Sequence, residues 1–198
     1  MTTYFDTVSR SYADVKTSPG IDTSEFLQAS EGLVKLFDLL GNPAFSVVQN
    51  DLNGNIKKVR ERLLATPEVS STLQDLVHHE GKPGDKKRPA TQGLLWLLRG
   101  LDFTAQALRR STSNANEELA KSFGEAYTAT LSQYHSFVIK PVFHLAMKAC
   151  PYRAEFYLKL GSPVEKVEAE LEKWLTALET IVRIMQKFYA DGNYAKGL

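Results

Sequence analysis

The chain has 198 residues, of which 43% are hydrophobic and 24% are charged, and its formal net charge is +1. This composition predicts one folded domain with a substantial core, and the small net charge argues against a general affinity for nucleic acid. The single cysteine, Cys150, excludes an intramolecular disulfide. Without a signal peptide or a run of roughly 20 apolar residues, we expect a cytoplasmic protein with only peripheral membrane contact.

Apolar residues recur at helical spacing along the chain, and no sustained strand-like alternation occurs. The segment 90–110 is apolar nearly all round and should lie centrally. Pro141 should kink its helix, because proline lacks a backbone donor. The sequence therefore predicts an all-α single domain, residues 1–198, with about eight helices. They cover residues 4–11, 22–40, 45–66, 73–77, 90–110, 117–134, 136–148 and 164–189.

The predicted helix over residues 45–66 has a polar edge beside an apolar stripe. At 100° per residue, Asp51, Asn55, Lys58 and Arg62 fall on one flank of that stripe. Such an edge can hold the polar group of a ligand whose apolar part enters the core. The alternative is a solvated helix face, where neighbouring charges contribute only about 0.2–0.5 kcal/mol per pair.

Motifs of known catalytic or metal-binding chemistry are missing from the sequence. We find no nucleophile elbow, P-loop, dinucleotide-binding turn or H-E-x-x-H helix. His78 and His79 are adjacent rather than helically spaced, which makes a poor metal site. The lysine-rich loop 81–89 is either a solvated loop or a phosphate-binding patch. We therefore expect no enzyme activity, no metal and no cofactor.

Motifs in four separate segments resemble those of the glycolipid transfer protein family, particularly its fungal members tied to heterokaryon incompatibility. The likeness covers nearly the whole chain from Ser24 onward. It implies a two-layer all-α sandwich that encloses a lipid between the layers. The motifs, in order, are Asp51-x-x-x-Asn55-x-x-Lys58, Leu94-Leu95-Trp96-Leu97-x-Arg99-Gly100-Leu101, Tyr134-His135-Ser136-Phe137 and Pro151-Tyr152-Arg153.

The resemblance also implies roles for individual residues around the lipid headgroup. Asp51 would bind both the first sugar and the ceramide amide N–H, His135 would donate to the amide carbonyl, and Trp96 would support the sugar ring. The full set of implied headgroup and amide contacts is Asp51, Asn55, Lys58, Trp96, His135 and Tyr194. The implied lining of the apolar tunnel is Phe37, Phe45, Val48, Phe103, Leu131, Phe143 and Phe156.

Phe137, Lys140 and Tyr152 are the expected membrane contacts. Phe137 stands where some relatives carry a membrane-contacting tryptophan, and an aromatic ring beside a cation suits the interfacial zone. The alternative for Phe137 is inward packing. Gln92 and Ala107 stand where some relatives have larger apolar residues, which affects the local shape of the tunnel.

The resemblance thus implies a soluble carrier that moves a glycosphingolipid between membrane surfaces. Each buried CH₂ contributes about 0.8 kcal/mol, so an apolar sleeve holds the chains, whereas polar contacts must select the headgroup. Asn55 and Trp96 favour a neutral sugar. Alternatives are a carrier of ceramide-1-phosphate or another phosphosphingolipid, a glycolipid sensor, a hydrolase that uses Asp51 and His135 but lacks a nucleophile, and a helical adaptor with a fully packed core.

Overall fold

The computed structural model describes residues 2–198, and its regular structure is helical throughout that range. Short 3-10 segments, designated η, connect several of the α-helices. The predicted all-α class is therefore confirmed. The eight α-helices of residues 2–198 are α1 (Thr23–Leu36), α2 (Ser46–Ala65), α3 (Leu73–Glu80), α4 (Pro89–Ser113), α5 (Leu119–Ala129), α6 (Ile139–Lys148), α7 (Arg153–Leu160) and α8 (Val164–Asp191).

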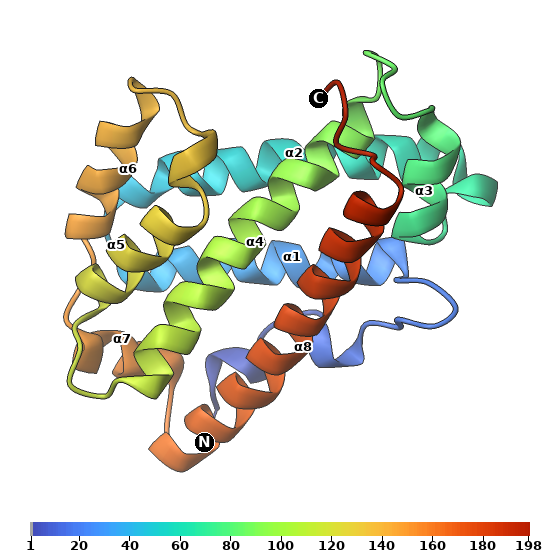
Figure 1. Ribbon diagram of the computed structural model, residues 1–198. Coiled ribbons are helices and arrows are strands. Elements are labelled where there is room, and N and C mark those ends of the chain that lie inside the picture. Colours follow the sequence, from blue (N-terminus) through green and yellow to red (C-terminus); the bar gives the residue numbers. More distant parts are fainter. Residues whose placement is uncertain (1) are drawn as a thin grey trace.

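The helices form two layers. In Figure 1, α1 and α2 run side by side in the rear layer, and α4 and α8 cross them in the front layer. Helices α5, α6 and α7 gather at one end of the molecule, while α3 lies at the other end. Helix α4 packs against α2, α3, α5 and α8. Its predicted central position is confirmed.

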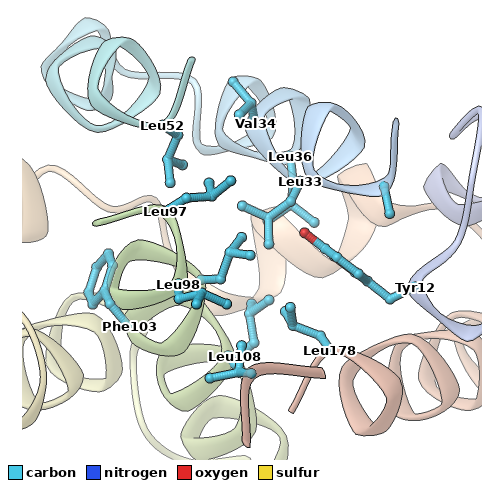
Figure 2. Close-up of a cluster of buried hydrophobic side chains, with 14 of the residues drawn as sticks. Tyr12, Leu33, Val34, Leu36, Leu52, Leu97, Leu98, Phe103, Leu108 and Leu178 are labelled. Carbon is cyan, nitrogen blue, oxygen red and sulfur yellow. The ribbon is translucent and has the colours of Figure 1, made fainter. Parts of the chain in front are cut away.

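Apolar side chains from both layers meet in one continuous core. Leu97 and Leu98 of α4 point toward Leu52 of α2 and Leu33 of α1, and Leu178 of α8 closes the cluster from the other side (Figure 2). All five side chains are at most 2% exposed. This burial is the main favourable term that holds the layers together.

Two glycines allow α4 to approach α2 closely. A Cβ atom on Gly100 would lie 2.7 Å from Cδ2 of Leu52, and one on Gly93 would lie 3.0 Å from Cβ of Lys58. Because such contacts are too short for heavy atoms, larger residues at these positions would push the helices apart. The glycines therefore set the spacing of the two helices that carry most of the predicted polar site.

Several element predictions were wrong in detail, and α7 was not among the predicted helices. Within the expected helix over residues 4–11 only one 3-10 turn forms, η1 (Tyr4–Asp6), and a second, η2 (Tyr12–Asp14), follows it, consistent with the low intrinsic stability of very short helices. The helix expected to reach residue 134 ends at Ala129, where the Thr130 hydroxyl donates to the Ala126 carbonyl over 2.7 Å.

The predicted kink at Pro141 was also wrong. Helix α6 begins at Ile139 rather than at residue 136, so Pro141 lies in its first turn. Amides in the first turn of a helix have no partner within that helix. A proline there costs no hydrogen bond and leaves the helix straight enough to continue to Lys148.

Candidate functional site

A cavity of about 360 Å³ opens between α2, α4 and the segment that leads into α6. Five residues of the predicted headgroup set line it, although they come from three separate stretches of the chain. The structure therefore brings five of the six predicted headgroup residues together around one cavity. These five residues are Asp51, Asn55, Lys58, Trp96 and His135, and the remaining lining residues are Val47, Gln92, Ile139 and Phe143.

The α2 wall of the cavity provides a carboxylate, an amide and an ammonium group within two helical turns. Asn55 is only 4% exposed, and its Nδ2 donates to Oδ2 of Asp51 over 3.4 Å. Burial raises the pKa of Asp51, and the positive charge of Lys58 opposes that rise. This wall can accept and donate hydrogen bonds to a polar ligand group.

The opposite wall is aromatic. The rings of Trp96 and His135 are nearly parallel, with an interplanar angle of 15° and centroids 6.1 Å apart. Burial, together with the nearby charge of Lys140, lowers the pKa of His135. The neutral imidazole is therefore favoured, and it combines one N–H donor with one acceptor nitrogen.

Tyr127 orients His135, and the sequence reasoning missed it. The Tyr127 hydroxyl lies 3.1 Å from Nδ1 of His135, and burial raises the pKa of that phenol, so it stays protonated. If the hydroxyl donates to Nδ1, the imidazole proton resides on Nε2, which is then free to donate to a ligand. The only sequence signal was the position of Tyr127 on the apolar face of its helix.

The structure does not place Tyr194 in the lining of the cavity. Its ring stacks on Phe188, with centroids 4.8 Å apart, and its hydroxyl lies 3.1 Å from Nδ1 of His78. Its carbonyl accepts a 2.8 Å hydrogen bond from the buried Arg88. These contacts hold the C-terminal segment against α3 and α8. In this structure Tyr194 therefore lies outside the cavity, and not at the headgroup position that the family resemblance implied.

All seven predicted tunnel residues are buried at 4% exposure or less in the common core. Phe143 also lines the cavity and lies 4.4 Å, centroid to centroid, from His135. Phe37 and Phe45 pack against each other at 5.9 Å. Phe143 therefore forms the junction between the polar cavity and the apolar interior.

The outer face beside the cavity carries exposed apolar side chains. Phe137 is 86% exposed, so inward packing of Phe137 is excluded. Tyr152 is 70% exposed, but it directly precedes α7 and lines a separate surface pocket with Lys148 and Glu155, away from the cavity. Lys140 is half-buried. The sequence reasoning missed four other exposed apolar residues, which lie in α6 and the turn before it: Val138, Ile139, Val142 and Leu145.

Other chemistries find little support in the described part of the chain. Residues 2–198 contain no cluster of three or more His, Cys, Asp or Glu side chains suited to a metal ion. Burial raises the pKa of the Cys150 thiol to about 12, so it is not a thiolate nucleophile at neutral pH. None of the helices in this range is long and apolar enough to cross a membrane.

The fold and the cavity together define an all-helical protein with a polar binding site at the edge of a buried apolar core. Sequence comparison matches residues 21–162 to the family model described as glycolipid transfer protein. A glycolipid transfer protein from Aureobasidium melanogenum is 54% identical over 190 residues, which cover 96% of this chain and 94% of that protein. The chain therefore belongs to the glycolipid transfer protein family.

Solved structures show the same relationship. The crystal structure of HET-C2, a fungal glycolipid transfer protein, aligns with a TM-score of 0.90 and 46% identity, covering 95% of this chain and 97% of that one. A structure of FAPP2, which selects simple glycosphingolipids using this fold, aligns with a TM-score of 0.86 and 30% identity. That alignment covers 98% of this chain and 97% of the other.

Proposed function

We propose that this protein binds one glycosphingolipid and carries it between membrane surfaces without changing it chemically. The observation that carries the proposal is the cavity at which Asp51, Asn55, Lys58, Trp96 and His135 meet, directly beside buried apolar side chains. A glycosphingolipid has the matching polarity, because its sugar and amide are polar whereas its two chains are apolar.

The composition of the cavity favours a neutral sugar over a phosphate. Lys58 is the one cation among its lining residues, whereas a phosphate carries up to two negative charges and is best held by several cationic donors. Asp51 would repel a phosphate and would accept from sugar hydroxyls and from the amide N–H. Trp96 offers an indole surface on which the C–H face of a sugar can pack.

The exposed surface of α6 and of the turn before it supports reversible docking on a membrane. Phe137, Val142 and Leu145 can enter the boundary between lipid headgroups and acyl chains, and Lys140 can meet lipid phosphate. Because the patch is small, docking by it alone is weak and reversible, as a carrier requires. We propose a cytoplasmic location with transient membrane association.

Transfer between vesicles tests the proposal directly. Donor vesicles would contain a monoglycosylated sphingolipid, ceramide-1-phosphate or plain ceramide, and arrival in acceptor vesicles would be measured with and without protein. We expect rapid transfer of the glycosylated lipid and little transfer of the other two. Preferential transfer of ceramide-1-phosphate would support a phosphosphingolipid carrier instead, and transfer of none would contradict the carrier function.

A further inference from the structure

Arg99 occupies an unusual position behind the aromatic wall of the cavity. Its guanidinium carbon lies 4.7 Å from the ring centroid of Trp96 and 3.6 Å from that of Tyr134. On the same helix, Arg109 and Arg110 pair with the carboxylates of Glu179 and Glu117. Among the described residues, Arg99 has no carboxylate partner of this kind and contacts two aromatic rings instead.

These contacts join two segments that are distant in sequence. Trp96 and Arg99 belong to α4, whereas Tyr134 ends the short helix η6 (Ser132–Tyr134) and directly precedes His135. Tyr134 is 44% exposed, so core packing alone does not fix its ring. The guanidinium therefore connects the segment that carries His135 to the helix that carries Trp96.

A planar cation suits this position. The rings of Trp96 and Tyr134 are nearly perpendicular, with an interplanar angle of 78° and centroids 6.2 Å apart, and the guanidinium carbon lies over both rings. The compact ammonium of lysine cannot stack on a ring as a planar guanidinium can. Burial lowers the pKa of Arg99, but an arginine in a protein keeps its charge. The attraction between cation and ring is consequently retained under all ordinary conditions.

We propose that Arg99 is a positioning residue, whose guanidinium over the rings of Trp96 and Tyr134 sets the orientation of the indole and the place of His135, and thereby the selectivity for a glycosyl headgroup. This inference rests on the proposed function. It assigns to Arg99 no direct contact with the lipid.

The test uses the Trp174→Phe background, in which Trp96 becomes the single tryptophan, because the chain has two. Arg99→Met removes the cation, and Arg99→Lys keeps the charge without the plane. Two quantities would be measured for each folded variant: the fluorescence anisotropy of Trp96 in the free protein, and the dissociation constants for monoglycosylceramide and plain ceramide in detergent-free vesicles. Arg109→Met provides a matched control on the same helix.

We expect Arg99→Met to lower the Trp96 anisotropy and to weaken binding of monoglycosylceramide about tenfold, with a smaller loss for plain ceramide, which has the amide that faces His135 but no sugar for Trp96. Arg99→Lys should give intermediate values, and Arg109→Met should leave both quantities unchanged. Wild-type anisotropy and wild-type lipid preference in both Arg99 variants would overturn the inference. If the parent protein does not prefer monoglycosylceramide, the proposed function fails, whereas the anisotropy still decides whether Arg99 positions Trp96.

Discussion

At the scale of single residues, the cavity depends on a few side chains whose ionisation the surroundings control. Burial raises the pKa of Asp51, while Lys58 favours its ionised form. His135 is held neutral by burial and by Lys140. An acceptor carboxylate therefore faces a neutral imidazole donor, the combination that a ligand with both a donor N–H and an acceptor carbonyl requires.

Replacing Asp51 with valine should abolish glycolipid transfer while the fold survives. Hydrogen bonds to a charged group contribute about 1.5–3 kcal/mol each, so losing contacts to the sugar and to the amide should slow transfer at least about 100-fold. The measurement is vesicle-to-vesicle transfer together with a thermal melt. Glu61→Val is the control, because Glu61 is an exposed carboxylate of α2 outside the cavity. Equal transfer by both variants would show that Asp51 is only a surface charge.

Replacing Trp174 with alanine should mainly lower stability, whereas replacing Trp96 should mainly lower headgroup affinity. Trp96 is partly exposed in the cavity, whereas Trp174 is 2% exposed and packs against Tyr12 at 5.3 Å. Trp174→Ala should cost about 3–5 kcal/mol of unfolding free energy. Trp96→Ala should cost less stability but more headgroup affinity. Denaturant unfolding and glycolipid titration measure the two effects, and equal affinity losses at matched stability would contradict a platform role for Trp96.

At the scale of elements, α6 has two faces with different partners. Phe143, Ala146 and Met147 are buried, whereas Val142 and Leu145 are exposed. Since residues three to four positions apart share a helix face, the helix has apolar side chains on its inner face and on part of its outer face. The inner face shapes the cavity, and the outer face is available to a membrane.

Phe137→Ala should weaken membrane docking without weakening the fold. The side chain is 86% exposed, so its loss should change the unfolding free energy by less than about 0.5 kcal/mol. Loss of an inserted ring should reduce partition onto vesicles about tenfold. Vesicle sedimentation measures the partition, and Leu64→Ala, at a 74% exposed position of α2, is the control. A large loss of stability with intact vesicle binding would contradict the docking role.

Glycines of the two cavity-bearing helices should respond oppositely to substitution by alanine. Nothing lies within 4 Å of a Cβ placed on Gly54 of α2, whereas a Cβ on Gly100 of α4 would collide with Leu52. Gly54→Ala should therefore stabilise the protein by about 0.5–1 kcal/mol, and Gly100→Ala should destabilise it by about 1–3 kcal/mol. Chemical denaturation tests both signs, and stabilisation by Gly100→Ala would show that the helices do not need this close approach.

At the scale of the whole molecule, a lipid needs more room than the cavity alone supplies. The cavity volume of about 360 Å³ lies at the small end of the range for ligand sites. The residues expected to line the tunnel pack against one another in the core. Two long chains can enter only if packed side chains separate, and the peripheral helix α6, which contacts α5 and the turn before α2, is the element best placed to move.

Hydrogen exchange should show this movement. Amides of residues 142–148 in α6 should exchange faster than those of the central helix α4, because few contacts hold α6 in place. Saturation with a long-chain glycosphingolipid should slow the exchange in α6 at least about tenfold, since the bound lipid stabilises the folded state in which α6 packs against its chains. Mass-spectrometric exchange with and without lipid measures it. Equal protection of α4 and α6 before lipid addition would exclude α6 as the moving element.

The sequence by itself determined the helical class, the central position of α4 and the polar edge of α2. These features are local: the spacing of residues within one helix decides which side chains share a face. Motif resemblance further identified Trp96 and His135. The ends of the helices near Thr130 and Pro141 were less well predicted, because side-chain hydrogen bonds and first-turn geometry decide them.

Only the tertiary structure decided which faces meet. It brought His135 against Trp96, supplied Tyr127 as the partner of His135, and placed Arg99 behind the aromatic wall. It also placed Tyr194 away from the cavity lining. These contacts join residues from different helices, and helical periodicity carries no information about how two helices pack. Their geometry depends instead on the close-packed fit of the whole core.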